Sequence, residues 1–255
     1  MKLNRDILHR VMMIAQEMTE IGAEISRVEE SVDRICCAYG AVRADVFATT
    51  SNIIVSVEDE NGAVITQTRR IKKQISNNME KLHRYNALVR SLTQNTPEKE
   101  EIDRLLCEAR NTKKYPAWLT VLCSAMISSA FCLFFGARSW QELLTAFVVG
   151  TASGLLSEIM DRMRFNPIFI RFLCAFAASG IATAAVYYQF IEAPDFVLIG
   201  NIMTLIPGVG LTNAMRDLFS GDVISGILRS IEALLFALAI AFGIMLPSLL
   251  FGGAL

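Results

Sequence analysis

The N-terminal part of the chain alternates apolar and polar positions with the periods of regular secondary structure. Apolar residues recur every three or four positions over residues 5–21 and 24–39, which predicts two amphipathic helices. Gly22 separates the two stripes, and Gly40 follows the second as a C-terminal cap. The period then falls to two over residues 42–49, as in a half-buried strand.

A meander and two more helices complete this pattern. Asn61-Gly62 favours a hairpin between the second and third strands, because both residues tolerate positive φ. Thr96-Pro97 is typical of a helix start, with threonine as the N-cap and proline at the first helical position. We therefore predict an α+β domain of two helices, a three-stranded meander and two helices. The remaining elements are expected at residues 53–58, 63–68, 71–93 and 97–112.

From residue 117 onward the apolar runs are longer than the helices of a soluble domain. The run at 117–136 has no charged residue, and at about 1.5 Å per residue it crosses a hydrocarbon core of about 30 Å. Small residues are dense in these runs and favour close packing of the helices into a bundle. Five transmembrane spans are expected, near 117–136, 141–157, 168–188, 196–213 (broken at Pro207) and 223–250.

Composition separates the same two parts. Residues 1–114 hold 18 Lys and Arg and 17 Asp and Glu, whereas residues 115–255 hold 6 and 8. The chain therefore divides into a charged domain at 1–114 and a lipid-embedded domain at 115–255. A net charge of −1 without a dominant basic cluster excludes a nucleic-acid-binding protein.

Basic residues gather at one end of the predicted spans, which orients the chain in the membrane. Arg138 alone lies in the outer loops, and the acidic loop at 189–195 also belongs outside. The N-terminus lacks the apolar segment of a signal peptide. We expect a multi-pass inner-membrane protein with a cytoplasmic N-terminus and an extracytoplasmic C-terminus. The inner flanks hold Lys113, Lys114, Arg162, Arg164 and Arg216.

The fourth span holds the most informative residues. Pro207 removes a backbone donor and Gly208 favours non-helical geometry, so the helix is expected to break. Such a break frees backbone groups at membrane depth and indicates a substrate site in transporters, where a half-helix N-terminus suits a carboxylate. The alternative is an ordinary helix end followed by a cytosolic loop. Asn201, Asn213 and Asp217 supply polar side chains along this stretch.

Ionisable residues within the spans are further candidates, since each costs about 2.5–3.5 kcal/mol at membrane depth. Arg229 and Glu232 lie three residues apart in the fifth span and share a helix face, where they can pair. Arg171, near the inner end of the third span, either snorkels to the lipid headgroups or has a functional role. Arg27 and Glu29 diverge on their helix, which is typical of a solvent-facing surface.

Other chemistry is not indicated. The six cysteines are scattered and the chain has only two histidines, so no metal-ligand spacing can be assembled. The chain shows no nucleotide-binding glycine loop and no nucleophile–base pattern. We therefore expect no metal, no cofactor and no enzymatic activity; a membrane-embedded enzyme is disfavoured.

Two motifs resemble those of a known family. The run Gly22-Ala23-Glu24-Ile25-Ser26-Arg27-Val28-Glu29 resembles the N-terminal motif of the bacterial threonine/serine exporter family. A second family signature is similar to Leu205-Ile206-Pro207-Gly208 together with Asn213, Asp217, Gly221, Gly226, Arg229 and Glu232. The resemblance covers nearly the whole chain, in motif order and in layout.

The resemblance implies a function that the composition and the spacing of residues do not indicate by themselves. Full-length members carry a second membrane half, so this chain is similar to the larger subunit of the split two-component exporters, whose partner is a small membrane protein of the same family. Members are associated with threonine, serine or succinate export. We therefore expect a subunit of a secondary-active exporter of a small carboxylate-bearing metabolite, driven by the proton gradient and working as a homo- or hetero-oligomer.

The position and charge of the candidate residues suggest their roles in such an exporter. Pro207, Gly208 and Asn213 would lie near the substrate, and Arg229 would offer a positive charge to its carboxylate. Glu232 would be the partner of Arg229 or a protonatable coupling group. A membrane-tethered signalling or scaffold protein, whose cytosolic domain carries the function, is the alternative. Asn201 adds a polar group, Asp217 would lie at the inner mouth, and Gly22, Arg27 and Glu29 would form a cytosolic gate or subunit contact.

Overall fold

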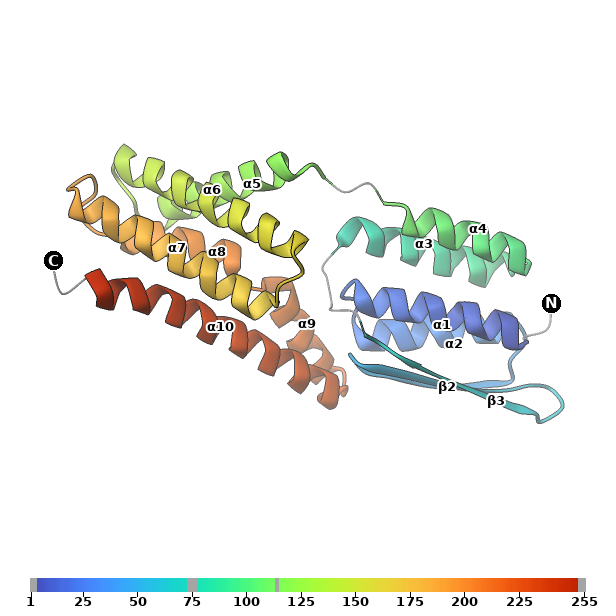
Figure 1. Cartoon of the computed structure of the whole chain (residues 1–255). Helices are drawn as coiled ribbons and strands as arrows, with labels where there is room; N and C mark the ends of the chain where they lie inside the picture. Colours follow the sequence, from blue (N-terminus) through green and yellow to red (C-terminus); the bar gives the residue numbers. More distant parts are fainter. Residues whose placement is uncertain (1–3, 73–77, 113–114, 252–255) are drawn as a thin grey trace. The chain divides into compact units, whose positions relative to one another are not determined.

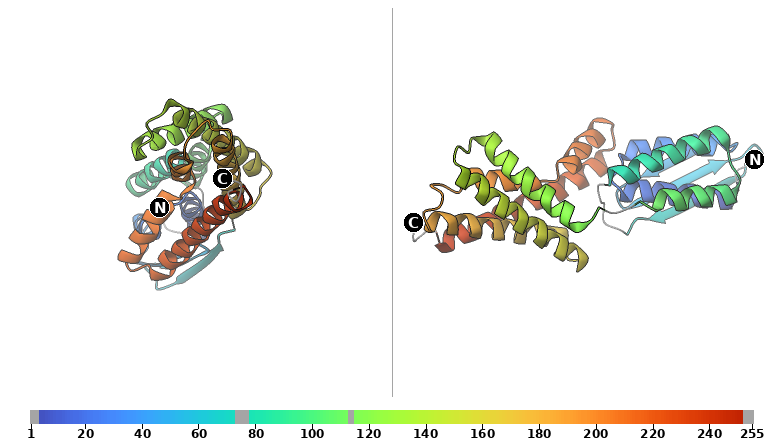
Figure 2. Two further views of the ribbon diagram at one scale, coloured as in Figure 1. Left: turned by 90° about the vertical axis from the view of Figure 1, so that its left-hand side faces the viewer. Right: turned by 90° about the horizontal axis from the view of Figure 1, so that it is seen from above.

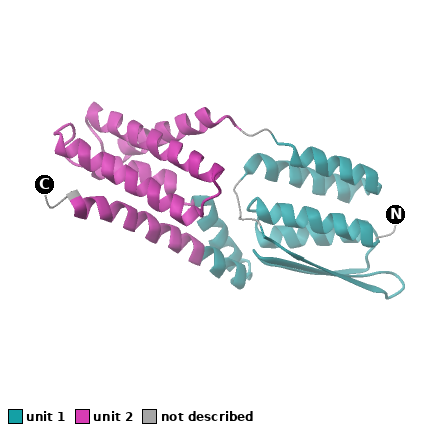
Figure 3. Cartoon of the chain, in the orientation of Figure 1, with its two compact units in different colours: residues 1–113, 208–230 teal, residues 114–207, 231–255 magenta. Residues whose placement is uncertain are grey.

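The computed structural model describes residues 4–72, 78–112 and 115–251. Its contacts divide the chain into two compact units, shown in Figure 3. The first comprises Met1–Lys113 and Gly208–Ser230, and the second Lys114–Pro207 and Ile231–Leu255. The contacts thus group a segment from late in the sequence with the N-terminal part. The domain boundary near residue 114 stays a prediction, and the C-terminal residues 252–255 lie outside the described ranges.

The N-terminal part of the first unit has three layers (Figures 1 and 2). A sheet lies against α1 and α2, and α3 and α4 cover the opposite side of these two helices. The core between the layers is apolar, and its largest fully buried side chains include Tyr39 and Tyr85. The helices are α1 (Arg5–Glu20), α2 (Ile25–Ala38), α3 (Met79–Asn95) and α4 (Lys99–Arg110).

The three strands form the predicted antiparallel meander in the order β1-β2-β3. Val46 pairs with Val55, and Val55 with Gln67. Alternation along β2 buries every second residue against the helices, whereas the intervening residues are only half-buried. The strands are β1 (Arg43–Ala48), β2 (Asn52–Glu58) and β3 (Val64–Arg70).

The β2–β3 turn differs from a two-residue hairpin. Only Gly62 has positive φ, at +75°, because the loop runs over residues 59–63. Asp59 organises this loop, since its Oδ1 accepts hydrogen bonds from the backbone amides of Asn61 and Ala63. These side-chain bonds add to two backbone bonds of the turn, from the Gly62 amide to the Asp59 carbonyl and from the Asp59 amide to the Ala63 carbonyl.

The predicted starts of the next two helices are wrong in detail. Helix α3 begins at Met79, with Asn78 as its N-cap, and residues 71–72 are not helical; residues 73–77 lie outside the described ranges. Thr96 does not cap α4. It ends α3 in the left-handed conformation, at φ +40°, and Glu98 is the N-cap of α4. Pro97 separates the two helices because it cannot continue α3.

The second unit consists of long apolar helices. In the described part of the chain four helices are long and apolar enough to cross a membrane, or five if α8 and α9 count as one bent span. Their outward faces are rich in exposed large apolar residues, as lipid-facing surfaces are. The second unit contains α5 (Ala117–Phe135), α6 (Trp140–Arg162), α7 (Pro167–Tyr187) and α8 (Asp195–Leu205). Helix α9 (Gly208–Phe219) belongs to the first unit, and α10 (Val223–Phe251) begins in the first unit and continues into the second.

Small residues bring α5, α6 and α8 close together. A Cβ atom at Gly150 would lie 2.8 Å from the Cα atom of Ala125, and one at Gly200 would lie 2.5 Å from the carbonyl oxygen of Ser128. The Ala125 Cα atom and the Ser128 carbonyl group both belong to the backbone of α5, so they cannot move away unless the whole helix shifts. Glycine is therefore required at both Gly150 and Gly200. The dense small residues therefore set the helix spacing, as expected where lipid offers no hydrophobic drive.

Candidate functional site: a polar junction within the first unit

The site is built on the short loop between α1 and α2. Gly22 follows the end of α1 with φ +84°, and its amide donates to the carbonyl of Thr19 while the amide of Ala23 donates to Met18. These two bonds form a Schellman C-cap, which turns the chain sharply into α2. The cap uses the amides of Gly22 and Ala23 but leaves their carbonyl groups available to other partners.

The second wall of the site is the turn between α9 and α10. Gly221 has φ +93°, which permits the tight reversal. At Gly226 a Cβ atom would lie 2.6 Å from Leu218 Cγ and 2.9 Å from the Leu218 amide nitrogen, so α10 passes close to α9 only because this residue is glycine. The close approach places Arg229 on α10 opposite Asp217 on α9.

Side chains from α9 and α10 donate to the loop carbonyls. Asn213 Nδ2 donates to the Gly22 carbonyl oxygen at 2.9 Å. Arg229 Nη2 donates to the Ala23 carbonyl oxygen at 2.8 Å in a buried hydrogen bond. Both groups that the Schellman cap left open thereby gain partners. We call this set, the loop at residues 22–25 with Asn213, Asp217 and Arg229, the polar junction.

Asp217 supplies the missing cap of α2. Glu24, the N-cap residue, makes no side-chain capping bond. Instead Asp217 Oδ1 accepts from the Ile25 amide at 3.3 Å, so a carboxylate from α9 lies at the positive end of the α2 dipole. Asn213 and Asp217 are four residues apart on α9, which puts both on the face that meets the loop.

Asp217 and Arg229 form the buried centre of the junction. Asp217 Oδ2 lies 3.4 Å from Arg229 Nε, and the two side chains are 0% and 5% exposed. Removing either charge would leave the other in a low-dielectric environment, so the pair is more sensitive to disruption than a surface ion pair. The sequence pattern does not indicate Asp217 as a carboxylate partner of Arg229. Among the acidic residues, only Glu232 lies within one helical turn of Arg229.

A second ion pair lies at the edge of the junction. Arg216 Nη1 contacts Glu24 Oε1, and the Arg216 side chain is 55% exposed. Solvent screens such a contact, so its contribution to stability is small. The Arg216–Glu24 pair joins α9 to the loop, whereas the buried Asp217–Arg229 pair joins α9 to α10.

The other predicted residues of α2 have different surroundings. Arg27 is exposed, as its position on the solvent-facing side predicted. Glu29 is half-buried and accepts from the Ala48 amide at 2.7 Å, so it fastens α2 to β1. Burial raises the pKa of Glu29, the Ala48 hydrogen bond opposes this shift, and the nearby charge of Asp222 adds to it. The prediction that these residues form a gate or subunit contact stays untested.

The remaining predicted residues belong to the second unit or its margin. Asn201 on α8 is 1% exposed and its carbonyl accepts from Thr204 Oγ1 at 2.7 Å. Helix α8 ends at Leu205, before Pro207, and α9 begins at Gly208, which is therefore helical rather than extended. Glu232 and Arg171 are half-buried. Their proposed roles toward a substrate rest on position in the sequence.

Within the described residues, no group of three or more His, Cys, Asp or Glu side chains could hold a metal ion. The junction instead presents amides, carbonyls and one ion pair. It can fix two segments of backbone relative to each other, and it can release them if the ion pair or its hydrogen bonds are lost.

Comparison with known proteins agrees with the two motifs. Residues 9–250 match the threonine/serine exporter family (ThrE), and the chain belongs to this family. It is 24% identical over 249 residues to the "Probable succinate transporter subunit YjjP" of Klebsiella aerogenes, covering 97% of this chain and 95% of the relative. The protein of the same name from Escherichia coli K12 is 24% identical, with 91% and 89% covered.

A third relative is longer than this chain. The "Probable threonine/serine exporter" of Mycobacterium tuberculosis is 22% identical over 243 residues, which cover 95% of this chain and 46% of the relative. No solved structure matches the chain. The relatives carry transporter and exporter names, and the chain is a multi-pass membrane protein rather than an enzyme.

Proposed function

We propose that the chain is a subunit of a secondary-active inner-membrane exporter of a small carboxylate-bearing metabolite. The candidates are threonine or serine and a dicarboxylate such as succinate, with the proton gradient as the driving force. Family membership supports export, and the names of the relatives supply both substrate classes. The word "subunit" in two of those names supports a small membrane protein of the same family as the partner.

The polar junction is the observation that carries this proposal. Hydrogen bonds between side chains and backbone groups join the N-terminal motif at Gly22–Ile25 to Asn213, Asp217 and Arg229 of the second signature. Helix α9, which supplies two of these side chains, begins directly after the break at Pro207. A movement of the N-terminal domain would therefore be transmitted to the helix that follows the break.

The proposal gives each part of the chain a role. The domain at 1–114 lies in the cytosol, and the spans at 115–255 enclose the transport path, with the C-terminus outside. Pro207, Gly208 and Asn201 lie near the path, and Glu232 carries the coupling proton. Arg27, exposed beside the junction, is available to a gate or to the partner subunit.

Transport by the purified protein in liposomes tests the proposal. The chain would be reconstituted into liposomes with and without its small partner. The liposomes would be loaded with labelled threonine or succinate, and efflux of the label would be followed under an imposed pH gradient. We expect efflux of one substrate class that needs the partner and collapses with a protonophore. Absence of transport of either class under any gradient, with both subunits present, would favour a scaffold role instead.

A further inference from the structure

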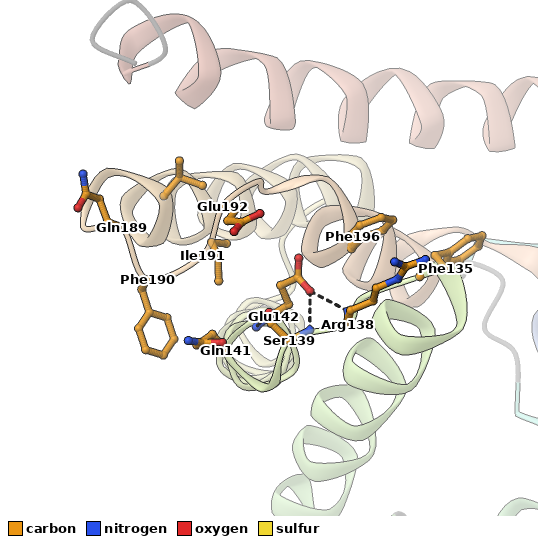
Figure 4. A pocket seen from close by; sticks show the side chains of 12 residues that line it. Phe135, Arg138, Ser139, Gln141, Glu142, Gln189, Phe190, Ile191, Glu192 and Phe196 are labelled. Atoms are coloured by element: carbon orange, nitrogen blue, oxygen red, sulfur yellow. Dashed lines mark hydrogen bonds between the residues drawn. The ribbon is translucent and has the colours of Figure 1, made fainter.

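A cavity of about 1060 Å³ lies at one end of the second unit, between the α5–α6 loop and the α7–α8 loop (Figure 4). Aromatic side chains form part of its wall, among them Phe190, which contacts Trp140 edge-on at 5.9 Å between ring centroids. Exposed Trp and Tyr side chains at this end are typical of the membrane–water interface. The cavity is therefore placed where a solute enters or leaves the bilayer region.

Three charged residues line this cavity: Arg138, Glu142 and Glu192. Glu142 is fixed by the capping box of α6, in which its Oε2 accepts from the amides of Arg138 and Ser139 at 3.0 and 3.1 Å. Figure 4 shows these two bonds and the carboxylate projecting from the start of the helix. The second carboxylate oxygen of Glu142 remains available as an acceptor in a defined position.

Arg138 and Glu192 face the same cavity without neutralising each other. Within the described ranges neither side chain forms a hydrogen bond or an ion pair, and both are exposed. The cavity thus offers one cationic donor and two carboxylates, of which one is held by backbone amides. A ligand that matches this set carries an anionic group for the guanidinium and an ammonium group for the carboxylates.

We propose that this cavity binds a free α-amino acid and disfavours dicarboxylates. The inference rests on the proposed export function and names the substrate class at one end of the path. An α-amino acid carries both required groups on one carbon atom, so a single small ligand presents a partner for each kind of charge that lines the cavity. A dicarboxylate would face two carboxylates with only one cation to balance it.

The chain contains a reporter for this site. It has two tryptophans, Trp118 and Trp140, and the neighbours of Trp140 in sequence, Ser139 and Gln141, line the cavity. A Trp118→Phe background leaves Trp140 as the single tryptophan. Full-length protein in phosphatidylcholine nanodiscs would be titrated with L-threonine while Trp140 fluorescence is recorded.

We expect L-threonine to change the Trp140 fluorescence in a saturable way. Lactate and ethanolamine each lack one of the two required groups and succinate carries two anionic groups, so none of the three should compete with threonine for the cavity. Arg138→Ala and Glu192→Gln should each weaken threonine binding roughly ten- to a hundredfold, the range for a hydrogen bond to a charged group. Arg138→Lys should recover part of the loss. Arg164→Ala is the matched control, since this exposed arginine lies in the α6–α7 loop outside the cavity and should leave binding unchanged.

Several results would overturn the assignment. These are no saturable change, equal affinity in Arg138→Ala and Arg164→Ala, or competition by succinate as strong as by threonine. Phosphatidylethanolamine also carries an ammonium and an anionic group, so a threonine signal that disappears in discs of this lipid would assign the cavity to a lipid headgroup. Liposome transport separates the two hypotheses: threonine efflux without binding here would leave the export function standing and remove this site.

Discussion

Breaking the buried Asp217–Arg229 pair should destabilise the protein strongly, and removing both charges should restore part of the loss. The pair has Oδ2 and Nε 3.4 Å apart and side chains at most 5% exposed. Arg229→Met leaves the Asp217 charge buried and removes the donor to the Ala23 carbonyl, which should cost about 3–5 kcal/mol. Asp217→Asn keeps an acceptor for the Ile25 amide and removes only the charge.

The double variant Asp217→Asn/Arg229→Met should be more stable than the sum of the single losses predicts, with a coupling of about 1–3 kcal/mol. The free energy of unfolding would be measured in mixed detergent micelles, with hydrogen exchange of the loop at residues 22–25 as a local probe. Arg216→Met is the control, because its exposed pair with Glu24 should contribute less than about 1 kcal/mol. Single losses that add within about 0.5 kcal/mol would show that Asp217 and Arg229 do not stabilise each other.

Three further predictions concern a glycine, a half-buried carboxylate and an exposed thiol. Gly226→Ala should destabilise the α9–α10 turn by about 1–3 kcal/mol because its Cβ would meet Leu218, whereas Gly180→Ala, where nothing lies within 4 Å, should be neutral; thermal unfolding compares them. Burial raises the pKa of Glu29, so Glu29→Gln should protect the amides of β1 from exchange at neutral pH, and its advantage over wild type should vanish as the pH falls and Glu29 is protonated. Cys107, kept as the single cysteine, is exposed and should react with an impermeant maleimide only after the cells are permeabilised; reaction in intact cells would place the N-terminal domain outside.

Much of the fold follows from local patterns. The amphipathic stripes of α1 and α2 and the alternation in β2 reflect burial on one face, which neighbouring positions already reveal. The predicted start of α4 is wrong because Thr96 ends α3 in the left-handed conformation, which β-branched residues rarely adopt and which the sequence pattern therefore does not indicate. Boundaries therefore depended on contacts that the local pattern does not contain.

The residues of the candidate site can be predicted from the sequence, but the contacts between them cannot. Gly22, Asn213, Asp217 and Arg229 were all identified, yet the partners of the Asn213–Gly22 bond are 191 positions apart. The spacing of Asn213 and Asp217 on one helix face was a usable signal for a shared contact. The role of Gly226 in bringing Arg229 to Asp217 depends on the turn geometry, which only the three-dimensional structure contains.

The coupling of the N-terminal domain to transport through the polar junction is tested most directly by measuring export. The protein for this test has a broken polar junction but inserts normally into the membrane. Wild type, Asp217→Asn/Arg229→Met and the control Arg162→Met, which removes only the exposed pair with Glu158, would be compared in liposomes at equal protein content. We expect efflux to be lost in the junction variant and unchanged in the control. Wild-type efflux from the junction variant would contradict the claim that the polar junction couples the N-terminal domain to transport.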